Sequence, residues 1–139
     1  MKKRIKKEDS VIVDDVTGSF ALISIQGPSS RKLLQSVTSQ DMSQIAFPFR
    51  CAKEIDIEYG RVLCTRITYV GELGYELLIP TEISAHVYEA LTAEQGKNGL
   101  RHAGLRALGS LRMVRILCVF GMMFDSLLIF ATLFTGKGL

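Results

Sequence analysis

The chain has 139 residues, 47% of them hydrophobic and 22% charged, which is the composition of a folded globular protein and excludes a disordered one. This length suits a single domain. The formal net charge of +3 is small, and much of the positive charge lies near the N-terminus (Lys2, Lys3, Arg4, Lys6 and Lys7). We interpret residues 1–10 as a solvated basic arm and expect no nucleic-acid partner, because no aromatic side chains are interleaved with the basic ones.

The first third of the chain predicts strands followed by a helix. Residues 11–16 and 20–25 are rich in apolar and β-branched residues, and we expect two strands separated by a turn. The Gly-Pro-Ser-Ser segment at 27–30 predicts the start of a helix, because proline suits a first helical turn and serine suits a cap. In the polar loop that follows the helix, Phe47 and Phe49 are expected to be hydrophobic anchors.

Strands dominate the middle of the chain. The alternating pattern of residues 54–58 predicts a half-exposed strand. Residues 61–69 and 75–79 predict two further strands, which flank Gly71 and Gly74 as a hairpin.

Two helices are expected next, at 81–94 with Thr81 as the N-cap and at 104–113. The predicted fold class is therefore α+β, with an antiparallel sheet and helices packed on one face. A doubly wound parallel sheet does not fit, because turns join most of the strands.

The three cysteines, Cys51, Cys64 and Cys118, are scattered and show no Cys-x-x-Cys spacing. With His86 and His102 they form no pattern typical of a zinc site, so no metal site is expected. We expect the thiols to pack as small hydrophobic groups in a reducing compartment.

The run Tyr-Val-Gly-Glu-Leu-Gly-Tyr-Glu at residues 69–76 is the most informative segment. Its carboxylate, Glu72, lies between two glycines, which allow positive φ angles or a close approach of the backbone to a ligand. A carboxylate on such a turn is well placed to accept hydrogen bonds from a ring rich in N–H groups. The simpler interpretation is a hairpin turn with an exposed glutamate.

This run is one of several blocks that together resemble the tetrahydrofolate-binding domain of the aminomethyltransferase family, the glycine-cleavage T-protein. The chain is most similar to the version fused to FAD-dependent sarcosine and dimethylglycine dehydrogenases. The resemblance covers part of the domain, and we divide the chain into the basic arm, a partial folate-binding domain at 11–113 and an unrelated hydrophobic tail at 114–139. The blocks occur in the family's order at residues 21–30, 33–34, 41–43, 47–49, 66–77, 79–80, 103–105 and 110–113.

The resemblance implies binding of tetrahydrofolate and transfer of a one-carbon unit to it. Glu72 matches the family's carboxylate that accepts hydrogen bonds from the pterin ring, and Tyr69 matches the motif's tyrosine, which would line that ring. Tyr75 is expected to pack. Leu108 stands where the glycine-cleavage enzymes have an arginine for the folate tail, and Arg112 is interpreted as structural more than ligand-binding.

The resemblance places the flavin and the catalytic aspartate of the fused dehydrogenases outside the matched region. The sequence contains no G-x-G-x-x-G dinucleotide motif. We therefore expect FAD only in a full-length parent, an oxidoreductase acting on CH–NH groups, and no catalytic residue in this chain, which would be inactive alone. Its partners would be folate and the missing part of its own domain. Relatives are mitochondrial in eukaryotes and cytoplasmic in bacteria.

The hydrophobic tail has three interpretations. Residues 116–134 carry one charge and predict a hydrophobic C-terminal helix of near-spanning length. We favour a tail that arises past a splice junction or frameshift over a membrane anchor or a buried helix. Two functional alternatives stay open: a non-catalytic regulatory module, similar to the regulatory subunit of pyruvate dehydrogenase phosphatase, or a small membrane-anchored protein.

Overall fold

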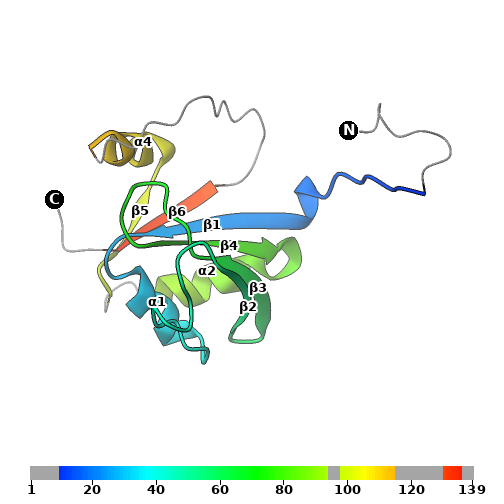
Figure 1. The fold of residues 1–139 in the computed structure, drawn as a ribbon, viewed down its shortest axis with the longest axis horizontal. Helices are drawn as coiled ribbons and strands as arrows, with labels where there is room; N and C mark the ends of the chain where they lie inside the picture. The colour runs from blue at the N-terminus through cyan, green and yellow to red at the C-terminus, as the bar shows by residue number, and fades with distance from the viewer. Residues whose placement is uncertain (1–9, 94–97, 115–129, 136–139) are drawn as a thin grey trace.

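The computed structural model of the chain describes residues 10–93, 98–114 and 130–135 (Figure 1). The strands lie side by side in the order β2-β3-β4-β1-β6-β5. Their bounds are β1 (Phe20–Gln26), β2 (Ala52–Ile57), β3 (Gly60–Thr65), β4 (Gly74–Pro80), β5 (Leu100–Ala103) and β6 (Phe130–Thr135). The helices are α1 (Ser30–Val37), α2 (Ser84–Ala93) and α4 (Leu105–Val114), with two short 3-10 helices, η2 (Thr17–Ser19) and η3 (Thr81–Ile83).

The sheet is antiparallel over β2, β3, β4 and β1. β6 lies parallel to β1 and pairs antiparallel with β5 at the far edge. β1 and β4 pair over their whole length, from Phe20 opposite Pro80 to Gln26 opposite Gly74. This arrangement confirms the predicted α+β class and the predicted pairing of the two strands that flank the glycine turn.

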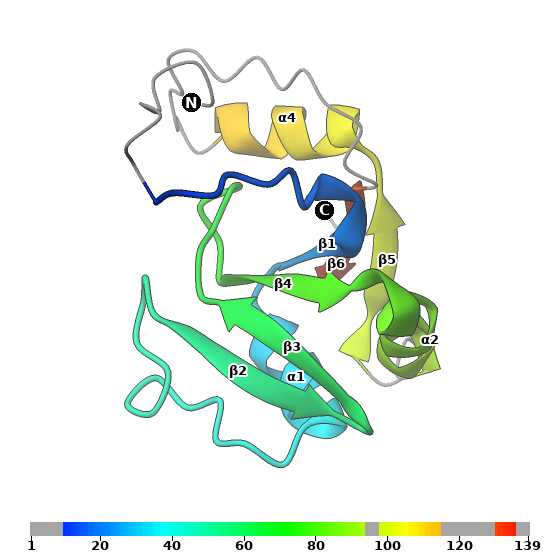
Figure 2. The ribbon, with the colours of Figure 1, turned by 90° about the vertical axis from the view of Figure 1, so that its right-hand side faces the viewer.

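The main hydrophobic core lies between the sheet and helices α1 and α2 (Figures 1 and 2). Ile23 and Ile25 of β1 both face it, because alternate residues of a strand point to the same side. The helices contribute their apolar stripes to the same core, with these residues fully buried: Leu33, Leu34, Val87 and Leu91. Helix α4 lies on the other side of the sheet (Figure 2), so α1 and α2 are the helices that share one face.

The strand predicted at residues 11–16 is not formed, since residues 10–16 contain neither helix nor strand. Figure 1 shows this segment leading away from the rest of the fold. Val11 and Ile12 are 55% and 86% exposed. The physical reason is the sheet order: β1 is already paired on both sides, by β4 and β6, so the segment before it finds no open neighbouring edge.

The strand before the glycine turn is shorter than predicted. β3 ends at Thr65 rather than at Tyr69, and the backbone of Arg66 pairs instead with the loop before β2. The amide of Arg66 donates to the carbonyl of Cys51 (2.8 Å), and the amide of Arg50 donates to the carbonyl of Arg66 (2.9 Å). The turn between β3 and β4 is therefore a broad loop over residues 66–73.

The start of the second predicted helix also differs. Thr81 lies in η3, and α2 begins at Ser84. The Thr81 hydroxyl donates to the carbonyl of Gly18 (3.0 Å), so it links η3 to η2 instead of capping α2. Helix α4 agrees with the prediction to within one residue at each end.

The C-terminal helix predicted within 116–134 is wrong for its last part, because Phe130–Thr135 forms β6. Residues 115–129 lie outside the described residues. β6 pairs with β1 from Leu22 opposite Phe130 to Gln26 opposite Phe134, and phenylalanine and threonine favour such a strand. Within residues 10–93, 98–114 and 130–135, no helix is both long and apolar enough to cross a membrane.

The side chain of Gln40 covers one position of the outer edge of the sheet, at Asp56 of β2. The Gln40 amide oxygen accepts a hydrogen bond from the backbone N–H of Asp56 (2.9 Å), and its amide nitrogen donates to the Asp56 carboxylate (3.2 Å). Arg61 of β3 donates to the same carboxylate (3.0 Å). The hydrogen bond from Arg61 lowers the pKa of the Asp56 carboxyl below its usual value.

Glu76 of β4 lies half-buried beside Ser24 of β1, its partner across the pair. Burial raises the pKa of the Glu76 carboxyl above its usual value. An acid with a raised pKa in the folded state keeps its proton to higher pH than in the unfolded state. Its contribution is therefore most favourable below about pH 4 and is lost as the pH rises through the folded pKa.

We predict that Glu76→Gln raises the free energy of unfolding at pH 7, by less than about 1 kcal/mol because the side chain is partly solvated. The gain should disappear below about pH 4, where glutamate is protonated in both states. Urea unfolding at several pH values measures it. The exposed Glu89→Gln should change stability little at either pH, and an equal gain there would contradict the role of burial.

Candidate functional site

The candidate site is built around the loop over residues 66–73, which carries Glu72. Gly71 has a φ of 78°, a left-handed conformation that side chains disfavour. The carbonyl of Leu73 accepts hydrogen bonds from the backbone N–H of Gly27 (2.8 Å) and from the Ser30 hydroxyl (3.3 Å). The loop is thus held against the junction between β1 and α1. Ser30 lies within the segment expected to cap the helix, and its hydroxyl bonds to this loop instead.

Gln26 fixes the same loop from the end of β1. Its side chain is fully buried and donates to the Ser24 hydroxyl (2.9 Å), while its amide oxygen accepts a hydrogen bond from Thr68 (3.2 Å). Gly74 lies directly opposite Gln26 in the sheet. A Cβ atom at Gly74 would overlap the Gln26 amide and would lie 2.7 Å from the carbonyl oxygen of Ile67. The loop therefore needs a glycine at its end to come this close to β1.

A pocket of about 410 Å³ lies beside this loop. Ligand pockets of drug-sized molecules start at about 300 Å³, so the space is sufficient for a fused ring system. Glu72 supplies a carboxylate to the lining, and the 53%-exposed Phe49 supplies an aromatic face. The pocket is lined by Arg31, Gln44, Phe49, Arg66, Thr68, Gly71, Glu72, Leu73 and Gly74.

Two arginines also line the pocket. Arg31, on the first turn of α1, donates through Nε to the Tyr75 hydroxyl (3.4 Å). Arg66 is 9% exposed and donates through Nη1 to the carbonyl of Phe47 (2.7 Å). Among the described residues, the buried Nε of Arg66 has no hydrogen-bond partner. The pocket thus pairs an acceptor, Glu72, with fixed cationic groups.

The two predicted folate-binding residues share the loop but differ in their surroundings. Glu72 lines the pocket, whereas Tyr69 is not among the lining residues. Tyr69 is half-buried, and the guanidinium of Arg112 lies over its ring, 4.3 Å from the centroid. Tyr75 is fully buried with its ring edge-on to Phe47 (5.8 Å), which confirms that it packs.

Sequence reasoning missed several pocket residues. Phe47 is buried as an anchor, but Phe49 is exposed and lines the pocket, so its predicted anchoring role is wrong. The Arg50 guanidinium lies 5.6 Å from the Phe49 ring centroid. Arg31 and Gln44 come from segments far from the glycine turn in sequence, and no spacing signal connects them to it. Phe49 and Arg66 do lie within the blocks that carried the family resemblance.

The thiols of the described cysteines fit the packing role that was predicted for them. Cys64 is fully buried in the core, and burial raises its pKa to about 12, so it is not a nucleophile near neutral pH. Cys51 is partly buried against the core. Among the residues that the structure describes, no group of three or more histidine, cysteine, aspartate or glutamate side chains could hold a metal ion.

A second hollow, of about 330 Å³, lies between α1, β2 and α2 and includes Asp56 and Glu58 in its lining. Both carboxylates are engaged. Asp56 holds Arg61 and Gln40, and a Glu58 oxygen lies 2.8 Å from Nε2 of His86, whose ring stacks on Tyr59 at 3.8 Å. The acidic groups of this hollow therefore have partners at the end of the β2–β3 hairpin, and we assign the hollow no ligand.

Comparison with known proteins identifies the family of the chain. The sequence profile described as the GCVT N-terminal domain matches residues 1–126. Human mitochondrial sarcosine dehydrogenase is 44% identical over 97 residues, which cover 70% of this chain. Mouse mitochondrial dimethylglycine dehydrogenase is 35% identical over 111 residues, or 80% of this chain. The mouse mitochondrial regulatory subunit of pyruvate dehydrogenase phosphatase is 30% identical over 122 residues, or 87% of this chain.

The chain belongs to the GCVT N-terminal domain family. It spans only a small part of these relatives, since the matched segments make up 11%, 13% and 14% of their respective lengths. The match extends over the glycine loop, the pocket and α4, and it ends before β6.

We predict that Gly74→Ala lowers the free energy of unfolding by about 1–3 kcal/mol, because the new methyl group overlaps the Gln26 amide and the Ile67 carbonyl. Urea unfolding followed by circular dichroism measures the loss.

Gly109→Ala is the matched control. Gly109 lies within α4, and an added Cβ there meets nothing within 4 Å. Alanine favours a helix over glycine by about 0.5–1 kcal/mol, so this variant should be more stable than the wild type. Equal and small effects at both positions would show that the loop does not depend on the close approach at Gly74.

Proposed function

We propose that this chain binds tetrahydrofolate in the pocket beside the glycine loop, with the Glu72 carboxylate as the group that recognises the pterin ring. The pterin carries N3–H and a 2-amino group on one edge, and both are donors. A carboxylate accepts two such bonds at once, and charge-assisted hydrogen bonds are about twice as strong as neutral ones. The observation that carries the proposal is the position of Glu72 in the lining of a pocket of about 410 Å³.

The surroundings of Glu72 support this assignment. The loop is fixed through the Leu73 carbonyl, through Thr68 and through Gly74, so little conformational entropy would be lost on binding. The Phe49 ring offers an apolar surface for a flat ligand. Tyr69 would contribute through the part of its ring that Arg112 leaves uncovered.

The chain would act as part of a larger flavoprotein related to sarcosine and dimethylglycine dehydrogenases. In such a parent, FAD would oxidise a methylated glycine and this domain would receive the released one-carbon unit on folate. The flavin would belong to another part of the parent, in keeping with the missing G-x-G-x-x-G motif. We assign no catalytic residue to this chain. The names of the dehydrogenases that it matches suggest mitochondria in a eukaryote, and a bacterial protein would be cytoplasmic.

A non-catalytic regulatory role is the second candidate. It is suggested by the similarity to a phosphatase regulatory subunit, which covers 87% of this chain, the same share as the similarity to human dimethylglycine dehydrogenase. Leu108 is 2% exposed and packs where the glycine-cleavage enzymes have an arginine for the folate tail. The resemblance implies an apolar residue there in the dehydrogenase-fused relatives too, so Leu108 does not separate the two candidates. A chain with no affinity for folate would favour this second role.

We predict that the full chain binds 5-formyltetrahydrofolate, a stable reduced folate, and that Glu72→Gln weakens binding about 10- to 100-fold. This loss corresponds to about 1.5–3 kcal/mol for hydrogen bonds to a charged group. Isothermal titration calorimetry measures the affinity.

Two controls sharpen this test. The exposed Glu82→Gln removes the same charge elsewhere and should leave the affinity unchanged. Para-aminobenzoylglutamate lacks the pterin and should not compete for the pocket. If Glu72→Gln leaves the affinity for 5-formyltetrahydrofolate unchanged, the assignment of Glu72 to the site is wrong.

A further inference from the structure

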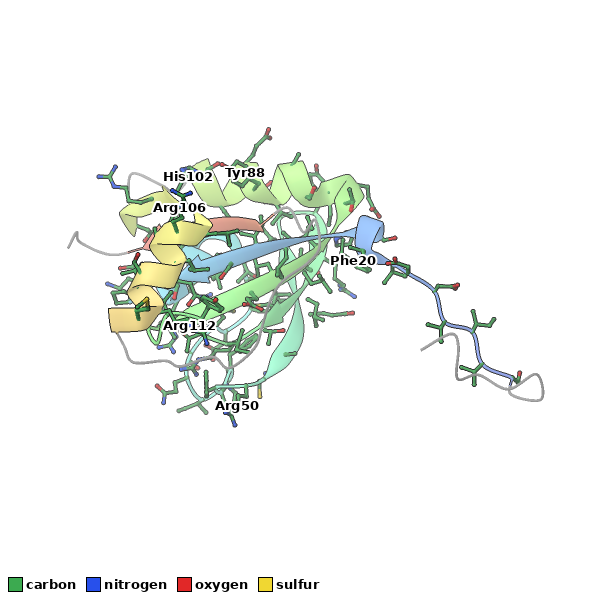
Figure 3. All side chains as sticks on the ribbon, turned by 90° about the horizontal axis from the view of Figure 1, so that it is seen from above. Phe20, Arg50, Tyr88, His102, Arg106 and Arg112 are labelled. Carbon is green, nitrogen blue, oxygen red and sulfur yellow. The ribbon has the colours of Figure 1, made fainter. Side chains whose placement is uncertain are left out.

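The contact between Arg112 and Tyr69 joins helix α4 to the candidate site. Arg112 lies in the last turn of α4 and is 9% exposed, and its guanidinium lies 4.3 Å from the centroid of the Tyr69 ring. Figure 3 shows Arg112 and Arg106 toward opposite ends of this helix. Helix and loop are more than thirty positions apart in the sequence, so the contact is a tertiary one.

The geometry favours a strong interaction. A guanidinium within about 6 Å of an aromatic centroid is attracted by the negative face of the ring, and the attraction grows when water is excluded. Here the cation is buried and the ring is half-buried. Arginine suits this role better than lysine, because its planar group stacks on the ring while its N–H groups stay available for other hydrogen bonds.

The contact also restricts how Tyr69 can meet a ligand. One face of the ring is covered by Arg112, so a second flat group can approach only the other face or the edge. Tyr69 lies three residues before Glu72 on the same loop, and fixing the ring therefore helps to fix the loop. Leu108, one turn earlier in α4, is buried and anchors the helix in place.

We propose that Arg112 is a positioning residue for the ligand site, which holds the Tyr69 ring in the orientation that the bound ring system requires. This inference rests on the proposed function, because the ligand is the reduced folate assigned there. The sequence indicated a role for Arg112 that is structural more than ligand-binding, and this inference connects that role to the ligand. Helix α4 would then support the site indirectly, through Tyr69, because no residue of α4 lines the pocket beside Glu72.

The contact between Arg112 and Tyr69 can be measured in the absence of ligand. The chain has four tyrosines and no tryptophan, so the near-ultraviolet circular dichroism band of tyrosine is not masked. We expect Arg112→Met to reduce this band by the same amount as Tyr69→Leu, and Arg112→Lys to retain part of it. Arg106→Met, at an exposed arginine of the same helix, is the matched control and should leave the band unchanged.

The affinity for 5-formyltetrahydrofolate is the second readout. Arg112→Met should weaken binding about tenfold, or 1.4 kcal/mol, and Arg112→Lys about threefold. In a Tyr69→Leu background, Arg112→Met should cause a smaller loss than it does alone, because much of its effect acts through the ring. If Arg112→Met does not fold, Arg112→Gln, which keeps a planar amide without the charge, carries the same expectations.

Three results would overturn the inference: an unchanged tyrosine band in Arg112→Met, an unchanged affinity despite a lost band, or losses that add independently in the double variant. If the wild-type chain binds no reduced folate, the proposed function fails and the ligand role of Arg112 is overturned with it. The tyrosine band then still reports whether Arg112 orders the Tyr69 ring, so the two failures are distinguishable.

Discussion

The close approach of β4 to the buried Gln26 side chain is the constraint on which the site depends. Gln26 fills the space that a side chain at position 74 would occupy, and its amide oxygen holds Thr68 at the other end of the loop. A buried amide is costly unless its polar atoms are bonded, and here Ser24 and Thr68 satisfy it. Gly74 and Gln26 therefore act together. Because Gly74 has no side chain, the Gln26 amide can pack against it and hold the loop beside the pocket through Thr68.

Around this anchor, the site combines rigid and charged parts from separate elements. α1 contributes Arg31, and the loop before β2 contributes Phe49. The buried Arg66 links this loop to the glycine turn through the Phe47 carbonyl. Binding groups held by such cross-links lose little freedom when a ligand enters, which favours recognition by a few well-placed hydrogen bonds rather than by a large buried area.

The residue pattern along the chain predicted those strands and turns that depend mainly on neighbouring residues. The alternation in residues 54–58, and the strand predicted at 75–79 after Gly71 and Gly74, correctly indicated strands joined by turns. The failures are non-local. Residues 11–16 have strand-like composition, but both edges of the adjoining strand β1 are already occupied. β5 and β6 depend on distant partners, because β6 pairs with β1 and β5 pairs with β6. Propensity cannot report whether a partner edge is open.

The site was predictable to a similar extent. The glycine turn and its glutamate were visible in sequence, because both residue types carry a local conformational or chemical signal. Arg31 and Gln44 reach the pocket only through tertiary packing, and the stacking of Arg112 on Tyr69 depends on how α4 crosses the loop.

The contact of Gln40 with the edge strand β2 is also a tertiary contact that no local pattern predicts. By occupying the outward N–H of Asp56, and with charged side chains along β2, this contact blocks one position at which another polypeptide could add a strand, which disfavours edge-to-edge pairing of two copies.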